Sequence, residues 1–398
     1  MDLGGKLGHL TYSTLVHPGD TWPEMWDSLT RYVPAVKKRF SPDKRFGVSL
    51  RISGKSAETL TGDPDEREKL KEFLASNDMY LFTANAFPHG PFKGEPVKEL
   101  VYEPDWRSDE RANYTMMVAD ILAEVAPEGV APSIQSPPCG FKPRVTGSEV
   151  VDAYTRQVLK TVAHLVKLEE RTGRWVKLAL EPEPACFLEL TTEVLDYFKN
   201  HLYTDASAAT LAKATGRSTK QAHDALRRHL GTVYDICHQA VEYENIADSL
   251  KSLKSAGIPV FKLQAAAAVR IPEVNRDIVN ALKAYDDPVY LHQTIEHKDG
   301  KSRQFIDLPQ AFEAFERDPG PREWRIHFHV PVFLEDLGDF KTTRSAIEEA
   351  LKVHKADPVS DQVEIETYTW DVLPDHLKTG DITDYVVSEL EWVQGELT

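Results

Sequence analysis

The chain has 398 residues, of which 41% are hydrophobic and 28% charged, values that exclude a disordered or low-complexity protein. Its 47 Lys and Arg against 63 Asp and Glu give a net charge of −16, which disfavours nucleic acid and anionic membranes as partners. Three cysteines form no disulfide framework, no apolar run approaches the roughly 20 residues that cross a bilayer, and the N-terminal sequence lacks a signal peptide's apolar segment. We therefore expect a cytoplasmic protein with no membrane insertion.

Short apolar runs alternate with longer amphipathic segments from one end of the chain to the other. The runs that we interpret as strands cover residues 8–16, 45–53, 79–87, 130–136, 175–184, 232–238, 259–267 and 363–370. Helical periodicity fills the spaces between them, for example over residues 109–126 and 149–173. This alternation predicts parallel strands joined by helices. Because the chain has eight such units, no linker and no nucleotide-binding glycine motif, it predicts an α/β fold of the (β/α)8 TIM-barrel type, in one domain over residues 1–398.

Two stretches exceed the plain barrel. Residues 204–230 indicate inserted helices between the fifth and sixth strands. Residues from about 285 to 335 contain two further strand-like runs, which predict an inserted β-hairpin between the seventh and eighth strands. We expect both insertions to lie near the end of the barrel that carries the active site.

Ionisable side chains gather where the predicted strands end, and in a TIM barrel the active site forms at the C-terminal ends of the strands. The side chains concerned are His9, Asn85, Glu181, Glu183, Asp235, His238, Lys262, Gln264, Glu364 and Glu366. Burying an unpaired carboxylate is costly, and a shared cation would remove that cost.

The strand-end residues therefore predict one divalent cation. Its ligands would be Glu181 or Glu183, together with Asp235 and Glu366, and a neutral ligand that is Gln264 or a histidine. This mixture of ligands suits Mn, Mg, Co or Zn. The alternative is that these carboxylates form ordinary salt bridges at the barrel rim.

A second pattern lies in the predicted hairpin. His327 and His329 alternate along a strand, so both imidazoles point to one face. This geometry suits metal or substrate binding, but exposed hairpin histidines produce the same pattern.

Several segments spread over the whole chain carry a resemblance to a known family. They include HLTYSTLVHPGDTW, LALEPEP, VYDICHQAVEYE, FKLQAAAA, IHFHVPVF and VEIETYTW. The chain resembles the xylose isomerase-like TIM-barrel superfamily of sugar isomerases, epimerases and endonuclease-IV-type enzymes, and more closely its EboE branch, often labelled "metabolite traffic protein". The resemblance implies a metal bound by Glu181, Asp235 and Glu366, with His238 contacting substrate. The chain departs from the pattern at strand seven, where Gln264 stands in place of a histidine found in many relatives.

We therefore expect a divalent-metal-dependent isomerase or epimerase of a sugar or cyclitol-like polyol, acting as a monomer or homodimer. Glu181 and Glu366 would serve as acid and base beside His238. The expected substrate contacts are His9, Asn85, Glu183, Lys262, His327 and His329. Two alternatives stay open: a non-catalytic metabolite-binding or traffic protein on the same barrel, and a metal-dependent hydrolase or nuclease. The acidic charge counts against the nuclease.

Overall fold

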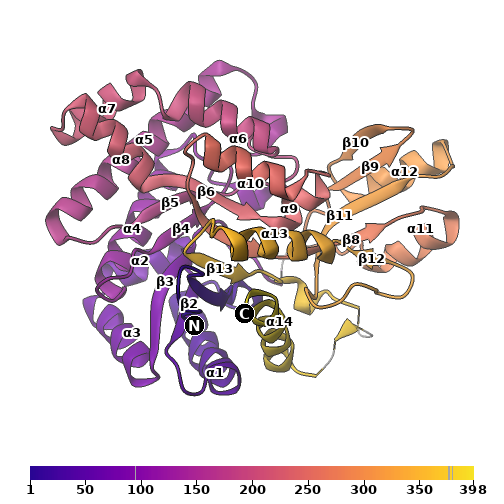
Figure 1. Cartoon of the computed structure of the whole chain (residues 1–398), viewed down its shortest axis with the longest axis horizontal. Helices are drawn as coiled ribbons and strands as arrows, with labels where there is room; N and C mark the ends of the chain where they lie inside the picture. Colours follow the sequence, from indigo (N-terminus) through magenta and orange to yellow (C-terminus); the bar gives the residue numbers. More distant parts are fainter. Residues whose placement is uncertain (95, 375–376, 379) are drawn as a thin grey trace.

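Eight parallel strands form the centre of the molecule in the computed structural model, which describes residues 1–94, 96–374, 377–378 and 380–398 (Figure 1). The strands are β1 (His9–Tyr12), β2 (Phe46–Arg51), β3 (Met79–Asn85), β4 (Ser133–Ser136), β5 (Lys177–Leu180), β6 (Leu230–Asp235), β7 (Val260–Ala265) and β13 (Gln362–Ile365). Pairing runs from β2 through β7 to β13 and β1, and a parallel bridge between Ser13 and Ser49 joins the two edges. The predicted TIM barrel is confirmed.

Most of the helices surround the barrel because their apolar faces pack against strands that are buried on both sides, and two helices belong to the insertion described below. They are α1 (Trp22–Phe40), α2 (Gly54–Gly62), α3 (Pro64–Ser76), α4 (Asp109–Val125), α5 (Ser148–Thr172), α6 (Thr191–Tyr197), α7 (Asp205–Thr215), α8 (Thr219–His229), α9 (Ile236–Val241), α10 (Ile246–Ser255), α11 (Arg276–Leu282), α12 (Leu308–Arg317), α13 (Arg344–Ala356) and α14 (Ile382–Leu397). Local signals set their ends: the Asp63 carboxylate caps α3, and Gly173, at φ 71°, ends α5. Within the described parts of the chain, no helix combines the length and apolar character needed to span a bilayer.

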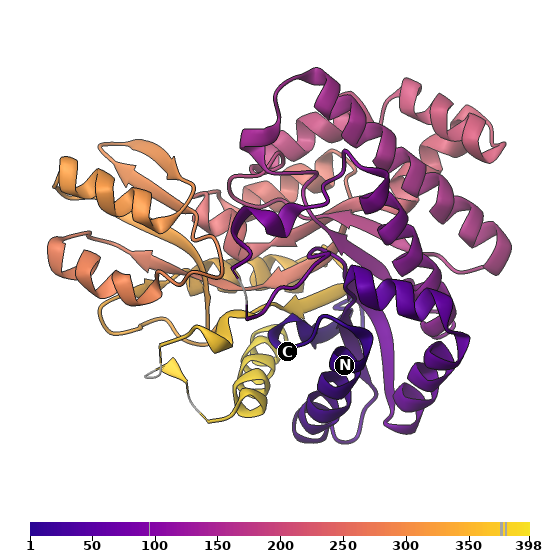
Figure 2. The same cartoon turned by 180° about the vertical axis from the view of Figure 1, so that it is seen from behind.

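The addition between β7 and β13 is larger than a hairpin. It is an antiparallel sheet in the order β10-β9-β11-β8-β12, which projects from one side of the barrel together with α11 and α12 (Figures 1 and 2). Its strands are β8 (Ala267–Ile271), β9 (Thr294–Lys298), β10 (Lys301–Phe305), β11 (Glu323–Val330) and β12 (Lys341–Thr342). The two predicted runs do pair, as β9 with β11, but β10 and α12 lie between them in the chain. Only Ala266 separates β7 from β8, since the alanine run there continues the apolar pattern without a turn signal.

The inserted helices predicted over residues 204–230 are α7 and α8. They pack on α5 outside the barrel, and α8 leads directly into the start of β6. Their position is therefore away from the strand C-termini, contrary to our expectation for this insertion, because the chain must return to the N-terminal side of the barrel before β6 begins.

The C-terminal helix α14 carries a buried carboxyl group. Glu389 Oε1 accepts hydrogen bonds from Val332 N at 3.2 Å and from Thr367 Oγ1 at 2.7 Å. Burial raises the pKa of Glu389 to about 8, although the Thr367 hydroxyl opposes the shift. A carboxyl group with a raised pKa stabilises the fold fully below its unfolded pKa, and this contribution is lost as the pH rises toward the folded pKa.

We expect Glu389→Gln to remove this pH dependence, because the amide keeps an acceptor oxygen and carries no charge. Between pH 5 and 8, the free energy of unfolding of the unsubstituted protein should fall relative to the variant, by at most about 1.4 kcal/mol per pH unit. Urea unfolding at each pH measures this difference. Glu391→Gln, on the exposed side of the same helix, is the control. Parallel pH profiles for Glu389→Gln and the unsubstituted protein would contradict the prediction.

Candidate metal centre

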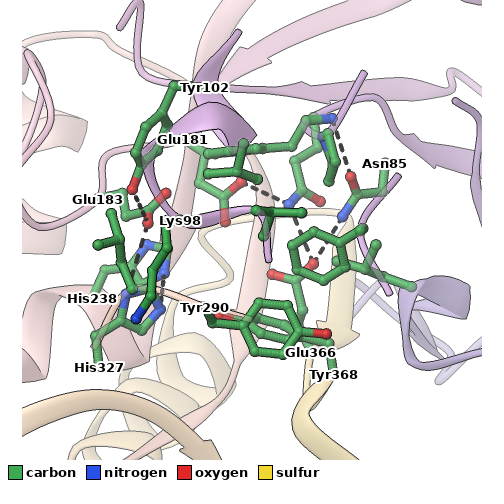
Figure 3. Close-up of a pocket in the computed structure, with 18 residues that line it drawn as sticks. Asn85, Lys98, Tyr102, Glu181, Glu183, His238, Tyr290, His327, Glu366 and Tyr368 are labelled. Carbon is green, nitrogen blue, oxygen red and sulfur yellow. Dashed lines mark hydrogen bonds and ion pairs between the residues drawn. The ribbon is translucent and has the colours of Figure 1, made fainter. Parts of the chain in front are cut away.

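A pocket opens at the C-terminal ends of the barrel strands. Its floor comes from strand ends, with Asn85 as the last residue of β3, Glu181 after β5 and Glu366 after β13. Figure 3 shows Glu183, His238 and His327 on one side of this floor and Asn85 and Glu366 on the other. The position agrees with the general location of TIM-barrel active sites.

Three buried carboxylates meet at the floor of the pocket. Oxygens of Glu181, Asp235 and Glu366 all lie within 4.8 Å of one another. The Gln135 amide joins two of them, since its Nε2 donates to Glu181 Oε2 at 2.6 Å and to Glu366 Oε1 at 3.3 Å. The Gln264 amide donates to Glu366 Oε2 at 2.6 Å.

The positive charge nearby does not balance these carboxylates. Lys262 Nζ lies 3.0 Å from Glu364 Oε2, so its charge is already paired. Burial, followed by the neighbouring carboxylates, raises the pKa values of Glu181 and Glu366 well above their ordinary values. Burial also raises the pKa of Asp235 to about 6, against the opposing effect of His329. A site that holds this much negative potential favours a cation.

Three imidazoles converge beside the carboxylates. His238 follows β6 in the first turn of α9, whereas His327 and His329 lie on β11 of the inserted sheet. His327 Nε2 lies 3.1 Å from His238 Nε2 and 3.1 Å from His329 Nε2. Burial lowers the pKa of all three imidazoles, that of His329 to about 4, so all are neutral at pH 7.

In each of the three rings, the hydrogen bond made by Nδ1 fixes which nitrogen carries the proton. Nδ1 of His238 faces Pro182 O at 2.8 Å, and Nδ1 of His329 faces the carbonyl oxygen of Glu366. His327 Nδ1 faces Gln293 Oε1 at 2.9 Å, and the Gln293 amide is itself oriented, because its Nε2 donates to Pro184 O at 3.1 Å. Each partner is an acceptor, so each Nδ1 carries the proton and each Nε2 presents a lone pair.

Lone pairs of three neutral imidazoles at this separation repel one another unless a cation lies between them. Donation from the second ring nitrogen to a carbonyl oxygen is also the usual support of a metal-binding histidine. Asp235 adds a fourth ligand, because its Oδ2 has no hydrogen-bond partner among the described residues and lies 3.7 Å from His238 Nε2. Gln264 Oε1, at the carboxylate group, is likewise buried without a partner in the described chain. These residues fit a divalent metal.

The structure brings most of the predicted site residues together. Asn85 Nδ2 donates to Glu366 Oε1 at 2.9 Å, and Glu183 Oε1 accepts from Tyr102 OH at 2.6 Å. Lys262 lies beneath the pocket and does not line it. His9 is not part of the cluster: it begins β1 at the opposite end of the barrel, where its ring packs against Tyr80 and Phe82. The predicted roles of all these side chains stay predictions.

Sequence reasoning treated the histidines separately and did not find Gln135, Tyr102 or Gln293. The spacings of Asp235 and His238 and of His327 and His329 are visible in the sequence, but the approach of the three histidines depends on how the inserted sheet packs against α9. No local pattern marks the three supporting side chains, because each acts through a contact with a residue far away in the chain.

The fold and the buried cluster define a TIM barrel with side chains at its C-terminal mouth that could hold a metal ion. No protein-family model matches the sequence, and a search of curated proteins finds no match. Among solved structures, a D-tagatose 3-epimerase-like protein has a TM-score of 0.50 and 13% identity, over 98% of this chain and 97% of that chain. A xylose isomerase-like TIM barrel protein from Mycobacterium smegmatis, solved with magnesium, has a TM-score of 0.50 and 10% identity, over 97% of this chain and 98% of that chain. At these identities the likeness establishes a shared TIM-barrel fold alone.

Proposed function

We propose that the protein is a divalent-metal-dependent isomerase or epimerase acting on a small sugar or polyol. The observation that carries the proposal is the close approach of three Nε2 atoms, with His327 3.1 Å from His238 and from His329, beside the buried Asp235, which groups with His238 and His329. Imidazole and carboxylate ligands together suit Zn²⁺ or Mn²⁺. The names of the two structural neighbours, a tagatose epimerase-like protein and a xylose isomerase-like barrel, support the substrate class.

The residues beside the cluster suit proton transfer at carbon. When bound, a divalent cation polarises a carbonyl group and the neighbouring hydroxyl of the substrate. This acidifies the C–H bond at the carbon that carries the hydroxyl. Glu181 and Glu366 both accept a hydrogen bond from Nε2 of Gln135, which holds the two carboxylates close together. One carboxylate takes the proton from carbon and the other returns a proton, to the opposite face in an epimerase. Asn85 fixes the orientation of Glu366, and burial keeps water from competing for the proton.

Solvent deuterium incorporation tests the proposal without knowledge of the product. The Zn²⁺- or Mn²⁺-loaded protein is incubated with a panel of ketoses, aldoses and inosose-type cyclitol ketones in D₂O, and proton NMR follows each C–H signal. We expect exchange next to the carbonyl of at least one compound, and at least about 100-fold slower exchange in Glu181→Gln, the lower end of what a general acid or base contributes. The exposed Glu128→Gln is the matched control. Metal binding without exchange in any compound would favour a carrier, the role that the EboE resemblance suggests.

One observation favours a second candidate, a metal-dependent hydrolase. Asp235 belongs both to a group with His238 and His329 and to the carboxylate group with Glu181 and Glu366, so the two groups together would offer ligands for two cations. Paired metals are common in hydrolytic sites. Two equivalents of bound Zn²⁺, with turnover of 4-nitrophenyl esters or phosphates and no C–H exchange, would select this function over the isomerase.

A further inference from the structure

The pocket has two chemically different halves. Its floor is the polar cluster already described. Its walls and mouth are apolar, and are formed by Leu15, Phe92, Val97, Val101, Tyr290 and Leu291. These wall residues come from the segments after β1 and β3 and from the insertion, which the backbone holds together: Val97 N and Lys98 N both donate to Val289 O, at 2.8 and 3.0 Å. The apolar half is thus a fixed part of the site.

Aromatic rings line the passage from the mouth to the histidines. The ring centroids of Phe92, Tyr290 and Tyr368 are 5.0 to 5.3 Å apart, and Figure 3 shows the two tyrosines next to Glu366. The Tyr368 ring also lies 4.5 Å from the ring of His329. The apolar wall therefore begins beside the histidines that we propose as metal ligands. A molecule bound to the metal would place its remaining part against these aromatic rings.

The charges of the pocket exclude an anionic group at the mouth. Lys98 is the only Lys or Arg among the described residues that line it, and its Nζ is paired with Asp307 Oδ2 at 2.7 Å. The carboxyl groups of Glu181, Glu183 and Glu366 line the same space. A phosphorylated sugar would meet no free cation there, and would lose hydration without compensation.

We propose that the natural ligand is an uncharged amphipathic molecule, with a chelating oxygen pair at one end and an apolar group of about ring size at the other. This inference rests on the proposed function and narrows its substrate class, from free or phosphorylated sugars to polyols or hydroxyketones that carry a hydrophobic substituent. Apolar and aromatic side chains line the pocket from its mouth to the ring of His329, so an apolar group on such a ligand meets a matching surface.

Hydroxamates test the inference because one chelating head can carry different tails. Acetohydroxamate, benzohydroxamate and phosphoglycolohydroxamate are titrated into the Zn²⁺-loaded protein by calorimetry, with free Zn²⁺ titrated in parallel to correct for intrinsic chelation. We expect benzohydroxamate to bind at least tenfold more tightly than acetohydroxamate. We expect phosphoglycolohydroxamate to bind no more tightly than acetohydroxamate. Tyr290→Ala should bring the benzo-to-aceto ratio close to one. Val101→Trp, which narrows the mouth without opening a cavity, should weaken benzohydroxamate selectively.

The control is Phe312→Ala, which removes a partly buried aromatic ring of α12 that lines no part of the pocket and should leave the ratio unchanged. Equal binding of the aceto and benzo compounds, or tightest binding of the phosphorylated one, overturns the inference while leaving the metal site intact. If none of the three binds to the Zn²⁺-loaded protein, the chelation that the proposed function requires is absent, and both proposals fail.

Discussion

Replacing His327 by alanine is expected to reduce the metal bound to the purified protein from near-stoichiometric to trace amounts. His327 is the middle of the three imidazoles, at 3.1 Å from each of the others, so its loss removes one imidazole ligand and leaves only His238 and His329 beside Asp235. We expect the dissociation constant for Zn²⁺ to rise by at least about 100-fold, the upper end of what loss of a supporting residue alone costs. Mass-spectrometric metal analysis and competition with a chromophoric chelator measure both quantities.

Two comparison variants separate a ligand from a merely structural histidine. Gln293→Leu removes the acceptor of His327 Nδ1 but keeps the imidazole, so the affinity should fall by about 10- to 100-fold, less than in His327→Ala. His164→Ala removes a surface histidine that pairs with Asp120 and should not change metal content. Full retention of metal in His327→Ala would falsify the three-histidine site.

Removing the metal is expected to destabilise the protein, and Glu181→Gln is expected to reverse part of that loss. At free metal near 1,000 times the dissociation constant, binding contributes about 4 kcal/mol to the free energy of unfolding. Chelation removes this contribution and leaves the carboxylates of Glu181, Asp235 and Glu366 facing one another. In the variant, the amide oxygen introduced at position 181 can still accept from Gln135, while the new NH₂ group can face the other carboxylates.

The raised pKa of Glu181 determines whether Glu181→Gln stabilises or destabilises the metal-free protein. Burial and the Glu366 carboxylate raise the pKa of Glu181 well above its ordinary value, so its stabilising contribution is complete below about pH 4.5 and is lost as the pH rises. At pH 8 the metal-free variant should therefore be more stable than the metal-free parent by about 1–3 kcal/mol, and the gap should be smaller at pH 5. Chemical denaturation with and without EDTA measures it, with Glu128→Gln as control. A less stable metal-free variant at pH 8 would show that Glu181 is satisfied without a cation.

The barrel could be predicted from the sequence because each strand is a short apolar run bounded by polar segments, and parallel strands buried on both faces leave this mark directly. For the same reason Glu181, Asp235 and Glu366 could be placed together: each ends a different barrel strand, and the barrel brings strand ends to one rim. His9 shows the limit of this reasoning. It lies in the first apolar run, but at the start of its strand, and hydrophobicity alone does not reveal which end of a run faces the pocket.

The insertion could not be predicted to the same depth. The β9–β11 pairing brings His327 next to Gln293, and a bulge in the pairing of β11 with β8 precedes His329. Both depend on register between strands that are distant in sequence, which a hydrophobic pattern does not specify. The barrel strands alone offer Gln264 as the neutral ligand, whereas the insertion supplies two of the three imidazoles, those of His327 and His329.

Two of the three imidazoles lie on β11 of the inserted sheet and the third follows β6 of the barrel, and this division makes the metal a mechanical link between two parts of the chain. The cation would couple the local opening of the inserted sheet to the barrel. Amide hydrogens of β9 and β11 would then exchange with solvent in a metal-dependent manner, while those of β3 and β4 on the far side of the barrel would not. The amount of bound metal would therefore determine how often the inserted sheet, and the part of the pocket wall that it supports, opens in the absence of substrate.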